Sequence, residues 1–178
     1  MDMTGETIRL AALPEVVAIV GSRDFPRLDA VRRFVALLSP QTLIISGGAR
    51  GVDRVAEEAA RTRGMPDPLI VRPTEAAIAS RGAKAALLAR NTEIVLETKR
   101  RGGVVIAFLL DPPRSGGTLD TLRKCDQYDV PAITFRATAA GMWLPTQVNR
   151  TVILHDRWRG LIGGVSGWKI SAACSSEE

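Results

Sequence analysis

The sequence predicts an α/β fold in which helices cover both faces of a parallel sheet. Short apolar runs alternate along the chain with amphipathic stretches, which is the order of strands and helices in such folds. Several of the runs are apolar at every position, as expected for strands buried on both faces. Glycine-rich turns follow these runs. The length of 178 residues suits one domain with a sizeable core.

Five apolar runs are predicted to be the strands of one parallel sheet. They span residues 16–20, 43–46, 69–71, 104–110 and 132–135. The run at 16–20 stops at Gly21, and the run at 104–110 is the most hydrophobic and leads into a turn at Asp111-Pro-Pro113. Residues 14–137 therefore read as a Rossmann-like open sheet with right-handed crossovers.

Helical spacing of apolar residues predicts the elements between these strands. Leu28, Val31, Phe34 and Leu38 lie on one face of a first helix, which Pro40 ends. A second helix runs from Val52 to about Gly64, residues 75–101 hold one or two helices with a break at Gly82, and Thr118–Tyr128 forms another.

The last forty residues break this alternation. Residues 1–140 are predicted to form the domain and residues 141–178 a short extension packed on it. The extension contains Trp143, Trp158, Trp168 and the glycine-rich segment 160–167, which favour short strands or a hairpin, and residues 171–178 are expected to fray. An apolar tail that bears Trp can cover a partner subunit, so the sequence leaves open whether the protein forms a homo-oligomer.

The amino-acid composition favours an anionic partner. The 24 Lys and Arg against 19 Asp and Glu give a net charge of +5, and twenty of the cations are Arg, which suits bidentate phosphate recognition. A compositional bias of the source genome explains the same numbers. Aromatic residues make up only 4% of the chain, so the sequence does not indicate a surface on which the bases of a single strand would stack.

The sequence gives no sign of a metalloprotein, a disulfide-rich protein or a membrane protein. Cys125, Cys174 and His155 cannot form a zinc site or a disulfide framework, so neither a metal nor a cofactor is predicted. No run approaches the roughly 20 apolar residues of a membrane span, and the first ten residues lack an export signal. A cytoplasmic setting is expected.

Three glycine-bearing loops follow predicted strands, at the end of a parallel sheet where ligands bind. They are Gly21-Ser-Arg-Asp-Phe25, Ser46-Gly-Gly-Ala-Arg-Gly-Val-Asp53 and Arg114-Ser-Gly-Gly-Thr118. Glycine lets a ligand approach bare amides, and helix N-termini favour phosphate. A Cβ at Gly48 or Gly117 is expected to intrude on the anion. Neither G-x-G-x-x-G nor a P-loop is present, which argues against dinucleotide dehydrogenases and P-loop NTPases.

These loops, together with Arg90-Asn91, resemble the SLOG superfamily. That group joins the DNA-processing protein A family, the Lonely-guy phosphoribohydrolases and the YspA-like proteins. The segment Gly21-Ser-Arg-Asp-Phe25 is most similar to the YspA-like branch, and Ser46–Asp53 resembles the S-G-x-A-R-G-x-D of DNA-processing protein A. The resemblance covers about 120 residues.

The resemblance implies a nucleotide or nucleotide-derived ligand held across the loops. The ligand-binding residues it implies are Gly21, Ser22, Arg23, Ser46, Gly47, Gly48, Arg50, Gly51, Asp53, Arg90, Asn91, Ser115, Gly116, Gly117 and Thr118. Asp53 either caps the following helix or meets a ribose hydroxyl. Arg90 either faces the cleft or lies on a solvated helix face.

Three functions follow from this resemblance. The first is a nucleotide-binding protein, such as a sensor of a nucleotide signal. The second is a phosphoribohydrolase, but Thr121 stands where those enzymes carry Glu, and Asp120 is one residue early, about 100° around a helix. The third is binding of single-stranded DNA. No catalytic residue is assigned, and His155 reads as structural.

Overall fold

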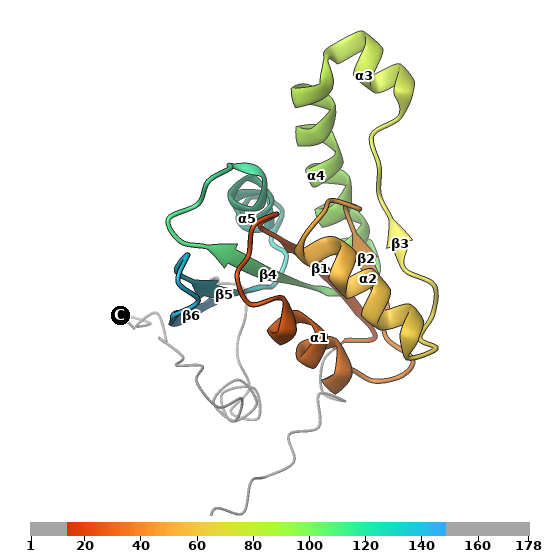
Figure 1. Cartoon of the computed structure of the whole chain (residues 1–178). Coiled ribbons are helices and arrows are strands. Elements are labelled where there is room, and N and C mark those ends of the chain that lie inside the picture. Colours follow the sequence, from red (N-terminus) through yellow and green to blue (C-terminus); the bar gives the residue numbers. More distant parts are fainter. Residues whose placement is uncertain (1–13, 149–178) are drawn as a thin grey trace, which may run out of the picture.

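The computed structural model describes residues 14–148 and contains one six-stranded sheet (Figure 1). The strands are β1 (Val16–Gly21), β2 (Leu43–Ser46), β3 (Leu69–Ile70), β4 (Val104–Leu110), β5 (Ala132–Ala137) and β6 (Trp143–Val148). They lie in the order β3-β2-β1-β4-β5-β6. Strands β1 to β5 run parallel to one another, whereas β6 is antiparallel to β5.

Five helices connect the strands. They are α1 (Leu28–Leu37), α2 (Val52–Thr62), α3 (Glu75–Arg81), α4 (Ala83–Arg100) and α5 (Gly117–Tyr128). Gly82, with φ +79°, separates α3 from α4 and confirms the predicted break, because this φ is one that glycine adopts readily.

Two hydrophobic layers hold the helices on opposite faces of the sheet. On one face Val31 and Phe34 of α1 and Ala56 of α2 pack against Phe108 and Phe135. On the other face Ile94 and Val95 of α4 and Cys125 of α5 pack against Ala18, Ile45 and Ala107. Every residue of β4 is buried, as its unbroken apolar sequence predicts.

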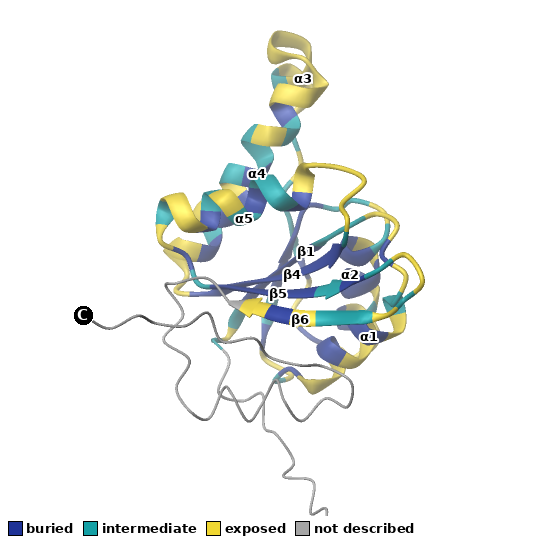
Figure 2. Cartoon of the chain, turned by 90° about the vertical axis from the view of Figure 1, so that its left-hand side faces the viewer, coloured by how far each residue is buried: buried dark blue, intermediate teal, exposed yellow. Residues whose placement is uncertain are grey.

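The helical arm formed by α3 and the first turns of α4 projects from the body of the molecule (Figures 1 and 2). No residue of α3 is buried. Ala86 is the first buried residue of α4, and from Asn91 onward the helix packs on the sheet. Arg90 and Asn91 therefore lie where the arm meets the body.

The predicted fold class is confirmed, with all five predicted strands parallel in one sheet. The sixth strand begins at Trp143, inside the segment predicted as an extension. His155, Trp158, Trp168 and the segments 160–167 and 171–178 lie outside the described residues. Within residues 14–148, no helix is long and apolar enough to cross a membrane.

Candidate functional site

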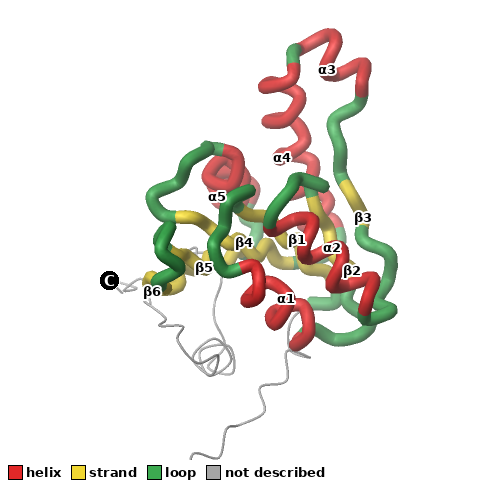
Figure 3. The backbone as a smooth tube through the Cα atoms, viewed as in Figure 1, coloured by secondary structure: helices red, strands yellow, loops and turns green. Residues whose placement is uncertain are grey.

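The loops after β1, β2 and β4 leave the same edge of the sheet, because these strands are parallel neighbours (Figure 3). The loop after β1 is fastened to β4. The Ser22 amide donates to the carbonyl of Phe108 at 3.0 Å, and the Ser22 Oγ accepts from the amide of Leu110 at 2.9 Å. Ser22 thus fixes one loop of the site against the central strand.

The Asp53 carboxylate joins two of these loops. It accepts from the amides of Gly21 at 3.2 Å, Gly47 at 3.2 Å and Ala49 at 3.4 Å. The residue before α2 is Gly51, which has no side chain to cap the helix. Of the two roles considered for Asp53, helix capping is therefore not the one it has, and its bonds tie loop backbone together.

Burial governs the electrostatics of Asp53. The residue is only 3% exposed. Loss of solvent raises the pKa of the Asp53 carboxyl to about 6, although the amide of Ala49 and the charge of Arg90 act in the opposite direction. Loss of solvent therefore disfavours the ionised carboxylate of Asp53, and the amide hydrogen bonds and the charge of Arg90 offset part of that cost.

Two glycines in the loop after β2 adopt conformations that other residues avoid. Gly48 has φ +67° and Gly51 has φ +85°. A Cβ at Gly51 would lie 2.4 Å from the carbonyl oxygen of Arg23, and one at Gly48 would lie 2.8 Å from Cγ2 of Ile70. Gly117 differs, because it is helical and has no positive φ, and an added Cβ would meet nothing within 4 Å.

Ser46 and Glu57 form a buried pair beneath this loop. The Ser46 hydroxyl donates to Glu57 Oε1 at 2.6 Å and accepts from the amide of Gly48 at 3.0 Å. Ser46 is fully buried, so the structure uses it to shape the loop. Sequence reasoning missed Glu57, because an acid in the middle of an amphipathic helix reads as solvated.

Arg90 faces the loops rather than a solvated helix face. Its Nη1 donates to the carbonyl of Gly47 at 3.0 Å and its Nη2 to Oδ1 of Asn91 at 2.9 Å. The Arg90 Nε is buried and has no partner within the described chain. Asn91 is 3% exposed and donates to Oδ2 of Asp120 at 2.9 Å and to the carbonyl of Gly117 at 3.3 Å.

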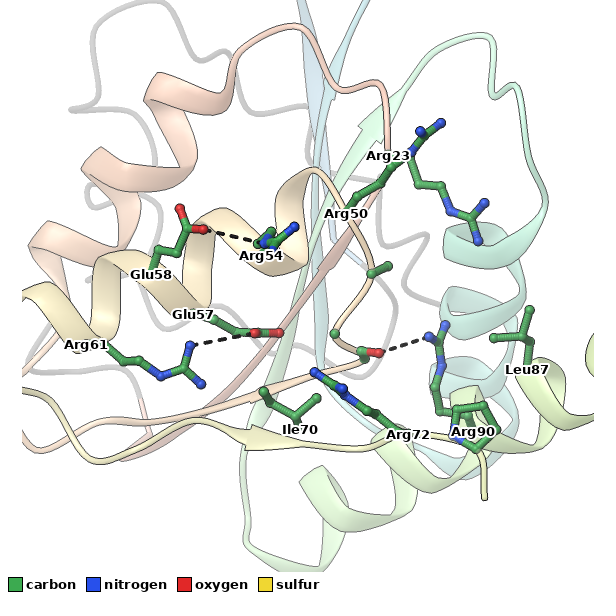
Figure 4. Close-up of a pocket in the computed structure, with 14 residues that line it drawn as sticks. Arg23, Arg50, Arg54, Glu57, Glu58, Arg61, Ile70, Arg72, Leu87 and Arg90 are labelled. Atoms are coloured by element: carbon green, nitrogen blue, oxygen red, sulfur yellow. Dashed lines mark hydrogen bonds and ion pairs between the residues drawn. The ribbon is translucent and has the colours of Figure 1, made fainter. Parts of the chain in front are cut away.

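One cavity of about 620 Å³ opens beside α2 and β3, and we refer to it as the arginine cavity. Six arginines and two glutamates lie in its lining (Figure 4). The lining comprises Arg23, Gly47, Gly48, Ala49, Arg50, Arg54, Glu57, Glu58, Arg61, Ile70, Arg72, Pro73, Leu87 and Arg90. An excess of positive charge with backbone amides nearby suits phosphate groups.

A second cavity of about 610 Å³ lies between the loops after β1 and β4, and we refer to it as the polar cavity. It mixes apolar, neutral polar and charged side chains. The lining comprises Val20, Gly21, Arg23, Ala49, Asp53, Lys84, Leu87, Leu88, Arg90, Asn91, Ile94, Ser115, Gly116, Gly117, Thr118, Asp120, Thr121 and Arg123. Such a mixture is typical of small-molecule sites.

The structure divides the fifteen predicted ligand-binding residues between the two cavities and their supports. Gly21, Asp53, Asn91, Ser115, Gly116, Gly117 and Thr118 line the polar cavity alone, whereas Gly47, Gly48 and Arg50 line the arginine cavity alone. Arg23 and Arg90 line both cavities. Ser22, Ser46 and Gly51 line neither cavity, and the first two instead hold loop backbone in place.

Asp120 lies nearer the site than its position in the helix suggests. The sequence places it about 100° from the face that a catalytic acid would need, yet Asp120 and Thr121 both line the polar cavity. The Asp120 carboxylate is engaged by Asn91 and by Lys124 Nζ, the latter at 2.7 Å. Among the described residues, no group of three His, Cys, Asp or Glu side chains is placed to hold a metal ion.

Comparison with known proteins adds one match. The family model described as DNA recombination-mediator protein A matches residues 3–111, a span that contains β1 to β4, two of the three glycine loops and Arg90-Asn91. The match agrees with the SLOG-type, Rossmann-like domain predicted from the loops. No curated protein matches the chain.

Proposed function

The chain belongs to the DNA recombination-mediator protein A family, and on this basis we propose that it binds single-stranded DNA with the strand's phosphates in the arginine cavity. A strand of DNA presents one negative charge at each nucleotide, so successive phosphates need several cations along one surface. Arginines in the cavity come from the loops after β1 and β2, from α2, from the segment after β3 and from α4.

The observation that carries this proposal is the set of arginines in the cavity that lack an acidic partner. Arg54 pairs with Glu58 at 3.5 Å, and Arg61 pairs with Asp67 at 3.1 Å. Within residues 14–148, by contrast, Arg23 and Arg72 form no ion pair. Cations without a neutralising carboxylate are the ones that a phosphate engages at least cost.

The Arg72→Ala variant tests the proposal. We expect weaker binding of a fluorescently labelled 20-nucleotide oligo(dT) in anisotropy titrations, by about 3- to 10-fold, because one charge-assisted contact is lost. The slope of log K against log salt concentration should become shallower by about 0.7, the contribution of one phosphate contact on a single strand. Arg72 is exposed, so its truncation spares the fold.

The matched control is Arg32→Ala. Arg32 is an exposed residue of α1 and lines neither cavity, so this variant removes the same charge elsewhere. It should bind oligo(dT) within 2-fold of the parent protein. Equal losses in the two variants would mean that only the overall charge matters, and absence of oligo(dT) binding by the parent protein would refute the proposed function.

A second candidate is a mononucleotide in the polar cavity. The observation in its favour is a lining that offers apolar surface at Val20 and Ile94 beside polar groups at Asn91 and Thr118. This candidate keeps the YspA-like and phosphoribohydrolase hypotheses open. Isothermal titration with deoxyadenosine monophosphate (dAMP) tests it, and Gly116→Asp should weaken the binding because it adds a negative charge to the lining.

A further inference from the structure

The arginine cavity and the polar cavity meet at a common wall. Four residues line both of them, namely Arg23, Ala49, Leu87 and Arg90. From this shared wall we infer that the cavities are linked in their occupancy, so that a mononucleotide in the polar cavity weakens the binding of single-stranded DNA in the arginine cavity. This inference rests on the proposed function.

Arg90 is the structural centre of the link, because it is bonded to one residue of each cavity. Its Nη1 donates to the carbonyl of Gly47, which lines only the arginine cavity. Its Nη2 donates to Oδ1 of Asn91, which lines only the polar cavity. The buried Nε has no hydrogen-bond partner in the described chain. One guanidinium thus serves two sites.

Arg23 supplies the second shared charge. Burial lowers the pKa of Arg90, the negative charge of Asp53 raises it, and the positive charge of Arg23 lowers it, which places the two cations within electrostatic reach of each other. An anion at this wall relieves their repulsion. Once one phosphate has done so, a second phosphate in the other cavity gains less from the same two cations and also meets a like charge.

The expected consequence is negative linkage rather than full exclusion. Each cavity keeps cations of its own, for example Arg72 in the arginine cavity and Arg123 in the polar cavity. The affinity for DNA should therefore fall to a lower limit as the polar cavity fills, and DNA should weaken nucleotide binding by the same factor.

The test is an anisotropy titration of labelled 20-nucleotide oligo(dT) with the full chain at rising dAMP concentration and constant ionic strength. We expect the apparent Kd for oligo(dT) to rise by about 5- to 50-fold and then level off. Isothermal titration with saturating oligo(dT) should show dAMP affinity lowered by the same factor. A Kd that rises without limit would mean that both ligands occupy one cavity, and a Kd that does not change would mean no linkage; either result overturns the inference.

A variant confined to the polar cavity identifies where dAMP acts. Gly116 lines only that cavity, and a Cβ there meets nothing within 4 Å. Gly116 is also the N-cap residue of α5, a position that Asp favours, so Gly116→Asp should fold. We expect at least 10-fold more dAMP to be needed for the same effect, with the Kd for oligo(dT) alone within 2-fold of the parent.

The control variant adds the same charge at the opposite edge of the sheet. Gln41 is exposed and precedes β2, whereas both cavities lie at the end of the sheet where the parallel strands finish. Gln41→Glu should leave the dAMP effect unchanged, and an equal response in both variants would overturn the assignment to the polar cavity. If oligo(dT) does not bind at all, the proposed function fails; if oligo(dT) binds and dAMP does not affect it, only the linkage fails.

Discussion

Two glycine-rich segments serve different ends: the loop after β2, taken with the last residue of that strand (46–51), and the loop after β4, taken with the first residues of α5 (115–118). In the first loop, Gly48 and Gly51 have positive φ, and a Cβ at either position would come within 2.8 Å of another residue. In the second loop, a Cβ at Gly116 or Gly117 would meet nothing within 4 Å. Glycine is required by packing in one loop and leaves open space in the other.

The polar groups around the two loops differ in the same way. Backbone amides of the first loop are held by the buried side chains of Asp53 and Ser46. In the second loop, the carbonyl of Gly117 accepts from Asn91 Nδ2 and from Thr121 Oγ1, at 3.3 and 3.2 Å. A glycine-rich turn at a strand end is therefore not by itself evidence of a ligand, because a neighbouring loop can occupy the space that the missing side chain leaves.

The largest expected effect is that of Gly51→Ala. The new Cβ would lie 2.4 Å from the carbonyl oxygen of Arg23 while the backbone stays at φ +85°, so the loops after β1 and β2 must separate. Strain and overpacking should together lower the free energy of unfolding by about 3–5 kcal/mol. Urea denaturation followed by circular dichroism measures this loss.

Gly64→Ala is the matched control for backbone strain. Gly64 has φ +66°, but a Cβ there meets nothing within 4 Å, so only the conformational cost of about 1–2 kcal/mol should appear. A Gly51→Ala protein no less stable than Gly64→Ala would show that the first loop tolerates a side chain, and the contrast between the loops would be lost.

A smaller effect is expected from the carboxylate that ties the first loop. Because burial raises the Asp53 pKa from 3.8 to about 6, the native state binds more protons than the unfolded chain between these values. The free energy of unfolding should therefore fall by about 2–3 kcal/mol as pH rises from 4 to about 7, and this contribution should stay constant above about pH 7.

The contribution of Asp53 is isolated by difference. The Asp53→Asn variant cannot ionise, so its stability should lack this decline, and subtracting its pH profile from that of the parent removes the other titrating groups. An NMR titration of the carboxyl gives the pKa directly. A value at or below 4 would show that the three amide hydrogen bonds outweigh the loss of solvent.

The periodicity of apolar residues is sufficient to predict the five parallel strands and the helices. A strand buried on both faces is apolar at every position and an amphipathic helix is apolar on one face, so both patterns are visible in the local sequence. Periodicity also led to the three loops, whereas Arg90-Asn91 came from the resemblance to the SLOG superfamily. The sixth strand was less visible, since β6 (WLPTQV) has no continuous apolar run and contains Pro145. The strand β6 forms by pairing with β5, and the sequence of β6 alone does not indicate that pairing.

The division of the site into two cavities could not be predicted, because it depends on residues far apart in the sequence. Arg72 follows β3 and reaches over Gly48, with its Nε 3.2 Å from the position of an added Cβ. Glu57 is buried on α2, where Ser46 donates to it from β2. A single sequence shows that Arg72 and Glu57 are charged but not which loop each of them meets.

The smallest expected effect is that of Gly117→Ala, which tests the open side of the comparison. Gly117 is the first residue of α5, where alanine adopts helical φ and ψ readily and restricts the unfolded chain more than glycine does. With no atom within 4 Å of the new Cβ, we expect the free energy of unfolding to rise by about 0.5 kcal/mol in urea denaturation. Gly48→Ala, its counterpart in the first loop, should instead lose about 1–3 kcal/mol, because the φ of +67° and the contact with Ile70 both oppose a side chain. A loss of more than about 1 kcal/mol in Gly117→Ala would mean that the second loop is as constrained as the first, and that its glycines are kept for packing rather than for the space beside the polar cavity.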